Sequence, residues 1–263
     1  MELKNLIILV TGGASGLGEA IALNFKEKES DVYICDLDEK KGLELEKSTN
    51  NKIKFIKCDV TKEEDVEEMI NRIRKEKGRI DCLVNCAGIF KAGFIATDKK
   101  VHNTNDFKKI LSINTFGTFN VSRYAAKLMI DNFNKDKECN GVIINISSIT
   151  ATDGGFASTA YSASKYAIDS MTLPMARDLG KYKIRVVTLS PSATITPLTK
   201  AINVDNKLMD YFIAINPLKR LGLPEDITLA TEFAIRNNYL NGTVIRIDGG
   251  KRVPHFWFDI IKV

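Results

Sequence analysis

An apolar run, a glycine-rich turn and a helical segment follow one another at the start of the chain, and this order restricts the possible folds more than any other feature. Residues 6–11 (LIILVT) are continuously apolar and rich in β-branched side chains, which is typical of a strand buried on both faces. The turn at 11–18 (TGGASGLG) follows, and we expect a helix over about 17–28. This succession is typical of the opening unit of a dinucleotide-binding fold.

The glycines of this turn each have an expected task. Gly12 permits the tight turn, Gly16 lets a pyrophosphate approach the backbone, and Gly18 lets the helix pack closely on the sheet. Free N–H groups and the positive dipole end of the helix favour phosphates here. We include Ser15 and Leu17 among the cofactor-binding residues. The spacing TGxxxGxG differs from GxGxxG, and an ordinary loop is the alternative interpretation.

An aspartate after the second strand predicts the cofactor. Residues 32–35 form this strand, and Asp36 follows about 20 residues after the glycine turn. A carboxylate at this point accepts hydrogen bonds from the adenosine ribose and repels a 2′-phosphate. Neither the glycine turn nor residues 36–39 contain Arg or Lys, so we expect NAD rather than NADP. The alternative is a surface aspartate that starts a turn.

Two further strand ends carry candidate cofactor residues. Asp59 and Val60 follow a strand at 53–57, and Asp59 is placed to reach the adenine edge or to cap the next helix, expected at 62–76. The small residues of Asn-Cys-Ala-Gly, with Cys86, Ala87 and Gly88, follow a strand at 80–84. They let the backbone lie against a cofactor, or serve packing alone.

The remaining pattern predicts one α/β domain over residues 1–263. Further strands at 142–147, 184–189 and 243–247 give a Rossmann-like, doubly wound parallel sheet of about seven strands with helices on both faces. The segment 192–224 resembles a lid over a site. The aromatic tail at 254–258 is too apolar to be free in water, and we expect it to pack on its own domain or on a partner subunit.

Ser148, Tyr161 and Lys165 form the candidate catalytic group. Ser148 follows a predicted strand, and Tyr161 and Lys165, four residues apart, share one face of a predicted helix. A free tyrosine has a pKa of about 10, and a neighbouring cation favours its phenolate, so we expect Lys165 to lower the pKa of Tyr161. A tyrosine and a lysine at this spacing are also commonplace in a lysine-rich chain.

Composition excludes several other classes. The net charge of +5, from 38 basic and 33 acidic residues, is a mild excess that does not indicate nucleic acid. No apolar run approaches the roughly 20 residues of a membrane span. Five scattered cysteines favour reduced thiols in an intracellular protein, and Cys82 and Cys86 have no second pair for zinc, so we expect no metal. A strand is expected almost at the N-terminus, so we expect no cleavable presequence.

Taken together, these motifs resemble the short-chain dehydrogenase/reductase family over nearly the whole chain. In that family the tyrosine is the general acid/base, the serine binds the substrate oxygen, the lysine contacts the nicotinamide ribose, and an asparagine holds a water in a proton relay. The resemblance implies these roles for Tyr161, Ser148, Lys165 and Asn114. It also implies that Pro191 lies against the cofactor and that Thr196 holds the carboxamide, although Thr196 also suits a helix cap before Pro197.

Within the family, sequence segments such as VNCAGI and MTLPMARDL resemble those of the mitochondrial 3-hydroxyacyl-CoA dehydrogenases. This resemblance implies NAD-dependent oxidation of 3-hydroxyacyl-CoA, fatty acid metabolism, a homotetramer and a mitochondrial matrix location, with the cytoplasm as the alternative. The alternative functions are a hydroxysteroid or other secondary-alcohol dehydrogenase, or a scaffold subunit of a mitochondrial RNA-processing assembly, in which case nucleic acid is also a partner. One departure is Ser192, where the family has glycine: either its backbone keeps a negative φ or the cofactor shifts.

Overall fold

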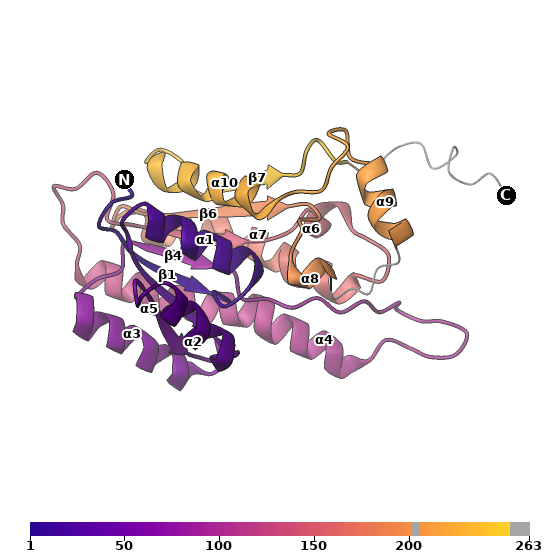
Figure 1. Ribbon diagram of the computed structural model, residues 1–263, viewed down its shortest axis with the longest axis horizontal. Helices are drawn as coiled ribbons and strands as arrows, with labels where there is room; N and C mark the ends of the chain where they lie inside the picture. Colours follow the sequence, from indigo (N-terminus) through magenta and orange to yellow (C-terminus); the bar gives the residue numbers. More distant parts are fainter. Residues whose placement is uncertain (201–205, 253–263) are drawn as a thin grey trace.

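In the described part of the chain, seven parallel strands form one sheet at the centre of the fold (Figure 1). The computed structural model describes residues 1–200 and 206–252. The strand order is β3-β2-β1-β4-β5-β6-β7, which confirms the Rossmann-like α/β fold expected from the sequence. The strands are β1 (Ile7–Thr11), β2 (Asp31–Asp36), β3 (Ile53–Lys57), β4 (Cys82–Asn85), β5 (Gly141–Ile146), β6 (Ile184–Pro191) and β7 (Thr243–Ile247).

Helices connect successive strands and cover both faces of the sheet, as a parallel sheet requires. No helix within the described ranges is long and apolar enough to cross a membrane. The helices are α1 (Gly16–Glu27), α2 (Glu39–Ser48), α3 (Glu63–Lys77), α4 (Thr104–Leu111), the π-helical segment η1 (Ser112–Gly117), α5 (Thr118–Asp131), α6 (Thr150–Asp153), α7 (Thr159–Gly180), α8 (Pro197–Lys200), α9 (Asn206–Ala214) and α10 (Pro224–Arg236).

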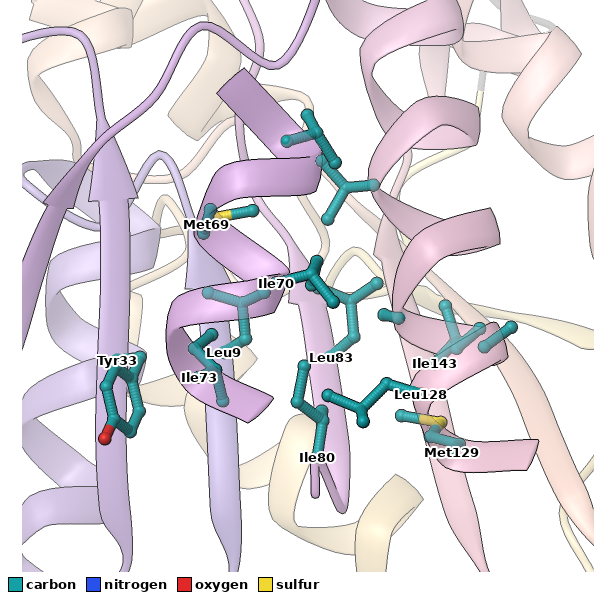
Figure 2. Close-up of a cluster of buried hydrophobic side chains, with 14 of the residues drawn as sticks. Leu9, Tyr33, Met69, Ile70, Ile73, Ile80, Leu83, Leu128, Met129 and Ile143 are labelled. Atoms are coloured by element: carbon teal, nitrogen blue, oxygen red, sulfur yellow. The ribbon is translucent and has the colours of Figure 1, made fainter. Parts of the chain in front are cut away.

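Two hydrophobic clusters hold these layers together. On one face, Met69, Ile70 and Ile73 of α3 and Leu128 and Met129 of α5 pack against Leu9, Leu83 and Ile143 of the sheet (Figure 2). On the other face, side chains of α1, α2 and α10, including Phe25, Leu45 and Ile227, pack against Val10, Val84 and Ile144. Successive side chains of each strand point to opposite faces of the sheet, so every strand contributes to both hydrophobic clusters.

The point where the chain reverses its direction across the sheet lies between β1 and β4. Thr11 and Asn85, the last residues of these strands, are register partners. In open α/β sheets, ligands bind outside the carboxyl ends of the strands at such a switch point. The glycine turn follows Thr11, so the fold brings the predicted cofactor loop to this place.

Several segments differ from the expected pattern. Helices α2 and α6 were not expected from the sequence, and the π-helical segment η1 lies between α4 and α5. The loop that follows β4 ends where α4 begins at Thr104, and an antiparallel bridge joins Ala96 and Val101 within it. The aromatic tail at 254–258 lies outside the described residues.

Candidate active site

A cavity of about 880 Å³ lies at the carboxyl ends of the strands and collects almost all the residues singled out in the sequence. Ser148 lines this cavity together with every expected cofactor residue, namely Gly12, Ser15, Gly16, Leu17, Gly18, Asp36, Asp59, Val60, Cys86, Ala87, Gly88, Tyr161, Lys165, Pro191 and Thr196. Asn114 is the exception: it is fully buried directly behind Gly88. The fold therefore brings together residues more than 180 positions apart in the sequence.

Two glycines of the turn, Gly12 and Gly18, lie so close to neighbouring backbone that a side chain would not fit. Gly12 and Gly16 have φ angles of +63° and +59°, a region that favours glycine. A Cβ atom on Gly12 would lie 2.8 Å from the backbone of Ala87. A Cβ atom on Gly18 would lie 2.2 Å from the Gly12 carbonyl oxygen, so glycine at this position lets the start of α1 pack closely on the turn that follows β1.

The beginning of α1 fits a phosphate group. Ser15 precedes the helix in an extended conformation and makes no side-chain capping hydrogen bond to any described residue. Gly16, Leu17 and Gly18, whose N–H groups begin the helix and have no partner within it, line the cavity. Because such N–H groups and the helix dipole bind anions, the residues present fit the pyrophosphate of a dinucleotide.

Asp36 ends β2 beside the glycine turn. Its Oδ2 accepts a hydrogen bond from the Ala14 N–H (3.1 Å) and its Oδ1 accepts one from the Asp38 N–H (3.1 Å). These bonds fix the carboxylate at the cavity wall and leave further lone pairs for ribose hydroxyls. The interpretation as a mere surface turn does not account for the bond back to the glycine turn.

Asp59 stabilises the turn before α3 but does not cap this helix, whose N-cap residue is Lys62. Its Oδ1 accepts hydrogen bonds from the N–H (3.0 Å) and the hydroxyl (2.7 Å) of Thr61, just before α3. The local turn-stabilising role is thus present, and Asp59 also lines the cavity. Contact of Asp59 with an adenine ring stays a prediction. The neighbouring Val60 is fixed through its carbonyl oxygen, which accepts a hydrogen bond from Asn120 Nδ2 (3.0 Å).

The segment after β4 lies flat against the end of β1. The hydroxyl of Thr11 accepts hydrogen bonds from the N–H groups of Cys86 (3.2 Å) and Ala87 (3.1 Å). Burial raises the pKa of the Cys86 thiol to about 12, so this thiol stays neutral. A Cβ atom on Gly88 would lie 3.3 Å from Asn114 Oδ1 and 3.6 Å from Lys165 Nζ, which makes this glycine the contact point between the segment and the catalytic group.

Asn114 joins three parts of the site. Its Oδ1 accepts a hydrogen bond from the Ile89 N–H (2.8 Å), and its Nδ2 donates to the Ile89 carbonyl (3.0 Å) and to Ser164 Oγ (3.0 Å). It lies in η1, and π-helical turns often occur at functional sites. Asn114 thus positions the loop after β4 against α7, which bears Tyr161 and Lys165.

Ser148, Tyr161 and Lys165 meet at the inner wall of the cavity. Lys165 Nζ donates a 2.7 Å hydrogen bond to the Ile146 carbonyl and lies 5.7 Å from the centroid of the Tyr161 ring. A hydrogen bond connects Ser148 and Tyr161, and Ser148 Oγ also accepts one from the Thr150 N–H (3.2 Å). A hydroxyl, a phenol and an ammonium are therefore close enough to hold one substrate oxygen and move one proton.

The pKa values of the two ionisable groups move in opposite directions. Burial raises the pKa of Tyr161 to about 12, although the hydrogen bond with Ser148 lowers it. Burial lowers the pKa of Lys165 to about 8. The expectation that Lys165 lowers the pKa of Tyr161 is wrong for the chain by itself, because burial raises this pKa and the group that lowers it is Ser148, not Lys165. The site holds a neutral phenol beside a lysine that gives up its proton readily.

Pro191 and Ser192 follow β6 at the cavity wall. Ser192 does not have a positive φ, which agrees with the first of the two expected accommodations, and its N–H donates to the Ile247 carbonyl (3.1 Å). Thr196 Oγ1 accepts a hydrogen bond from the Thr199 N–H (3.4 Å), which confirms its capping role before α8. Its role toward a carboxamide stays a prediction.

Three groups of lining residues were not identified from the sequence. Phe90 packs edge-on against Tyr161, with ring centroids 5.0 Å apart. Tyr211, Phe212 and Ile215 bring apolar surface from α9 and the turn after it. Asp153, Lys251 and Arg252 bring charge from the segments after Ser148 and β7. The spacing of the chain gives no signal for these contacts, because each depends on how distant elements pack.

Comparison with known proteins agrees with this geometry. A family model described as Enoyl-(Acyl carrier protein) reductase matches residues 12–252. The 3-hydroxyacyl-CoA dehydrogenase type-2 of Drosophila melanogaster is 40% identical over 254 residues, which is 95% of this chain and 99% of that protein. The human protein of the same name is 39% identical over 255 residues, covering 96% of this chain and 97% of its own length.

A solved structure shows the same fold. The crystal structure of 3-hydroxyacyl-CoA dehydrogenase type-2 from Mycobacterium avium has a TM-score of 0.87 and 30% sequence identity, and the match covers 97% of this chain and 99% of that one. Sequence, fold and the residues of the cavity agree. The chain therefore belongs to the short-chain dehydrogenase/reductase family, and it is an oxidoreductase similar to the 3-hydroxyacyl-CoA dehydrogenases of that family.

Proposed function

We propose that this oxidoreductase interconverts 3-hydroxyacyl-CoA and 3-oxoacyl-CoA with NAD as cofactor. The observation that carries the proposal is the convergence of Ser148, Tyr161 and Lys165 on one cavity that also reaches Asp36. The names of the Drosophila, human and mycobacterial relatives support acyl-CoA as the substrate class. The apolar side chains of Tyr211, Phe212 and Ile215 along the cavity suit an acyl chain.

The chain's own residues account for the proton and the substrate oxygen. A bound nicotinamide cofactor supplies or accepts the hydride. Ser148 Oγ donates a hydrogen bond to the substrate oxygen and holds it beside the phenol of Tyr161. Tyr161 gives its proton to that oxygen during reduction and takes the hydroxyl proton during oxidation. Lys165 bears on this step through its charge, since a nearby cation favours the phenolate that remains after reduction.

The preference for NAD rests on the charge of Asp36. Its carboxylate is fixed at the cavity wall by two backbone N–H groups. A 2′-phosphate placed at the same ribose would lie against this negative charge, whereas a 2′-hydroxyl would donate a hydrogen bond to it.

We also propose that α8 and α9, which lie along the cavity, act as the lid expected over residues 192–224.

Exposed apolar side chains on α5, α7 and α10 support the homotetramer that the resemblance implies. Phe119 of α5 and Leu173 of α7 are exposed by 45% and 44%, and Leu229 and Phe233 of α10 by 65% and 52%. Monomeric proteins rarely expose large contiguous apolar areas. Light scattering coupled to gel filtration tests this assembly: a mass of one chain at micromolar concentration would contradict it. The mitochondrial location stays a prediction from the resemblance.

The test of the proposed function is the initial rate of acetoacetyl-CoA reduction by the purified protein. We expect turnover with NADH and little with NADPH. A neutral hydroxysteroid, offered with NAD in the oxidative direction, should give a much lower kcat/KM. Preference for the steroid, or the absence of turnover with acetoacetyl-CoA in a protein that binds NADH, would overturn the acyl-CoA assignment.

A further inference from the structure

A group of charged side chains borders the cavity where the loop after Ser148 meets the end of β7. Arg246 forms ion pairs with Asp153 (2.7 Å) and with Asp248 (2.8 Å). Arg252 forms a second ion pair with Asp248. Both carboxylates of the group are therefore already neutralised by arginines, and Asp153 is held by two parallel N–H···O bonds from Arg246.

Lys251 is the surplus cation of this group. Within residues 1–200 and 206–252, no carboxylate lies within ion-pair distance of its ammonium, which lies 4.4 Å from the centroid of the Phe212 ring on α9. The side chain lines the cavity. Burial lowers its pKa, although Asp153 and Asp248 raise it. A partly desolvated cation without its own counter-ion is costly, and an anionic ligand would remove that cost.

The position of Lys251 suits the polar end of an amphipathic substrate. The adjacent Arg252 also lines the cavity and is 59% exposed, so this part of the wall lies where the cavity opens to solvent. Lys165, in contrast, is only 5% exposed. The cavity also has the apolar lining of Tyr211, Phe212 and Ile215, and Phe212 lies directly against Lys251. A ligand with an apolar chain and a phosphate matches both kinds of wall.

We infer that Lys251 binds a phosphate group of the coenzyme A part of the substrate. The inference rests on the proposed function and names the residue that selects its substrate class. A lysine ammonium binds phosphate as a point charge, which needs no fixed orientation of the phosphate. Neutral hydroxysteroids and sugars offer no group for this cation, so Lys251 favours a CoA thioester over these alcohols.

The test uses the enzyme saturated with NAD and compares Lys251→Met, Lys251→Arg and a control, Lys75→Met. Lys75 is an exposed lysine on α3 that does not line the cavity. Calorimetry with free coenzyme A measures binding without turnover. We expect Lys251→Met to raise the Kd about tenfold, as for the loss of one charge-assisted hydrogen bond. Lys251→Arg should restore binding, and Lys75→Met should change nothing.

Kinetics with two thioesters separates this inference from the proposed function. Acetoacetyl-CoA carries the phosphates, and acetoacetyl-N-acetylcysteamine lacks them. The kcat/KM for acetoacetyl-CoA divided by that for acetoacetyl-N-acetylcysteamine should fall about tenfold in Lys251→Met. This fall should come from a higher KM for acetoacetyl-CoA, with kcat unchanged. An unchanged ratio and an unchanged Kd for coenzyme A would overturn the role of Lys251 while acetoacetyl-CoA turnover stands. A wild-type enzyme that binds coenzyme A but reduces neither thioester would instead contradict the proposed function.

Discussion

The ammonium of Lys165 donates a 2.7 Å hydrogen bond to the carbonyl oxygen of Ile146, the last residue of β5. Ser148 follows two residues later, so this bond fixes α7 to the strand that carries the serine. The same bond holds a charge in a place where only 5% of the lysine is exposed. The site is therefore ordered at the expense of stability.

Replacing this lysine should make the protein more stable and inactive. The folded pKa of Lys165 is about 8, against an ordinary value of 10.5, and this difference corresponds to about 3 kcal/mol. The lost bond to Ile146 offsets about 1 kcal/mol of that gain. We expect Lys165→Met to raise the free energy of unfolding by about 2 kcal/mol at pH 7 and to abolish turnover. Urea unfolding without cofactor measures it.

The pH dependence provides the control for this prediction. Because the folded pKa lies below the unfolded one, the unfolded chain binds more protons between about pH 8 and 10.5. The free energy of unfolding of the wild type therefore rises with pH across this window, because the destabilisation caused by the buried Lys165 charge is lost as the lysine deprotonates. The advantage of Lys165→Met should be full below pH 8 and should shrink as the pH rises to 10.5. An advantage that does not vary with pH would contradict burial of the charge as its cause.

Removing the Asn114 amide should cost stability as well as activity. Asn114→Ala leaves the Ile89 N–H without its acceptor and the Ile89 carbonyl without its side-chain donor. The Ser164 hydroxyl loses the same donor but keeps its bond to the Tyr161 carbonyl. We expect a loss of about 2–4 kcal/mol in the free energy of unfolding. Asn71→Ala, on the exposed face of α3, should lose none. Equal stability of the two variants would show that the Asn114 bonds contribute little.

A neutral residue in place of Asp36 should weaken the choice between cofactors. Asp36→Asn keeps an acceptor for the Ala14 N–H but removes the negative charge. We expect the ratio of kcat/KM for NADH to that for NADPH to fall about tenfold or more, because a close charge–charge repulsion is lost. Asp38→Asn changes a neighbouring carboxylate that caps α2 and does not line the cavity. An equal effect in both variants would indicate a general change of charge.

The buried Arg185 should contribute strongly to the free energy of unfolding, because it joins β6 to the end of α10. Arg185 is 4% exposed and donates hydrogen bonds to the carbonyl oxygens of Ala234 and Ile235 in the last turn of α10 and of Leu240 in the turn before β7. Arg185→Met should lower the free energy of unfolding by about 3 kcal/mol, because the carbonyls of Ala234 and Leu240 lose their side-chain donor and Ile235 keeps only the Met1 ammonium. Arg236→Met, at an exposed position of the same helix end, should lower it by less than about 1 kcal/mol. Thermal unfolding compares the two.

Long periodic segments made most of the fold predictable. Buried strands such as β1 and β5 are largely apolar, and their boundaries differ from the expected ones by one residue. Helix α2 was missed because it is short, highly charged and contains Gly42, where a Cβ atom would lie 2.2 Å from the Phe55 ring. The requirement for glycine at that position comes from a distant strand and is not visible locally.

The sequence was sufficient to predict which residues form the catalytic group, but not their pKa values or the further residues that the fold brings to the cavity. Motif spacing identified Ser148, Tyr161 and Lys165, yet the pKa of Tyr161 depends on how deeply the phenol is buried, which packing decides. The π-helical turn around Asn114 has no sequence signature comparable to a glycine turn. Lys251 lies more than 80 residues from Tyr161, and only the fold brings both to one cavity.

The most direct test of the account is the rate of hydride transfer in Tyr161→Phe. This change removes only the phenolic hydroxyl, which is the proton donor, and keeps the ring that packs against Phe90. With acetoacetyl-CoA and NADH we expect kcat to fall about a hundredfold to ten-thousandfold, with NADH binding and thermal stability retained. Turnover close to that of the wild type in a folded, NADH-binding variant would show that Tyr161 is not the general acid/base.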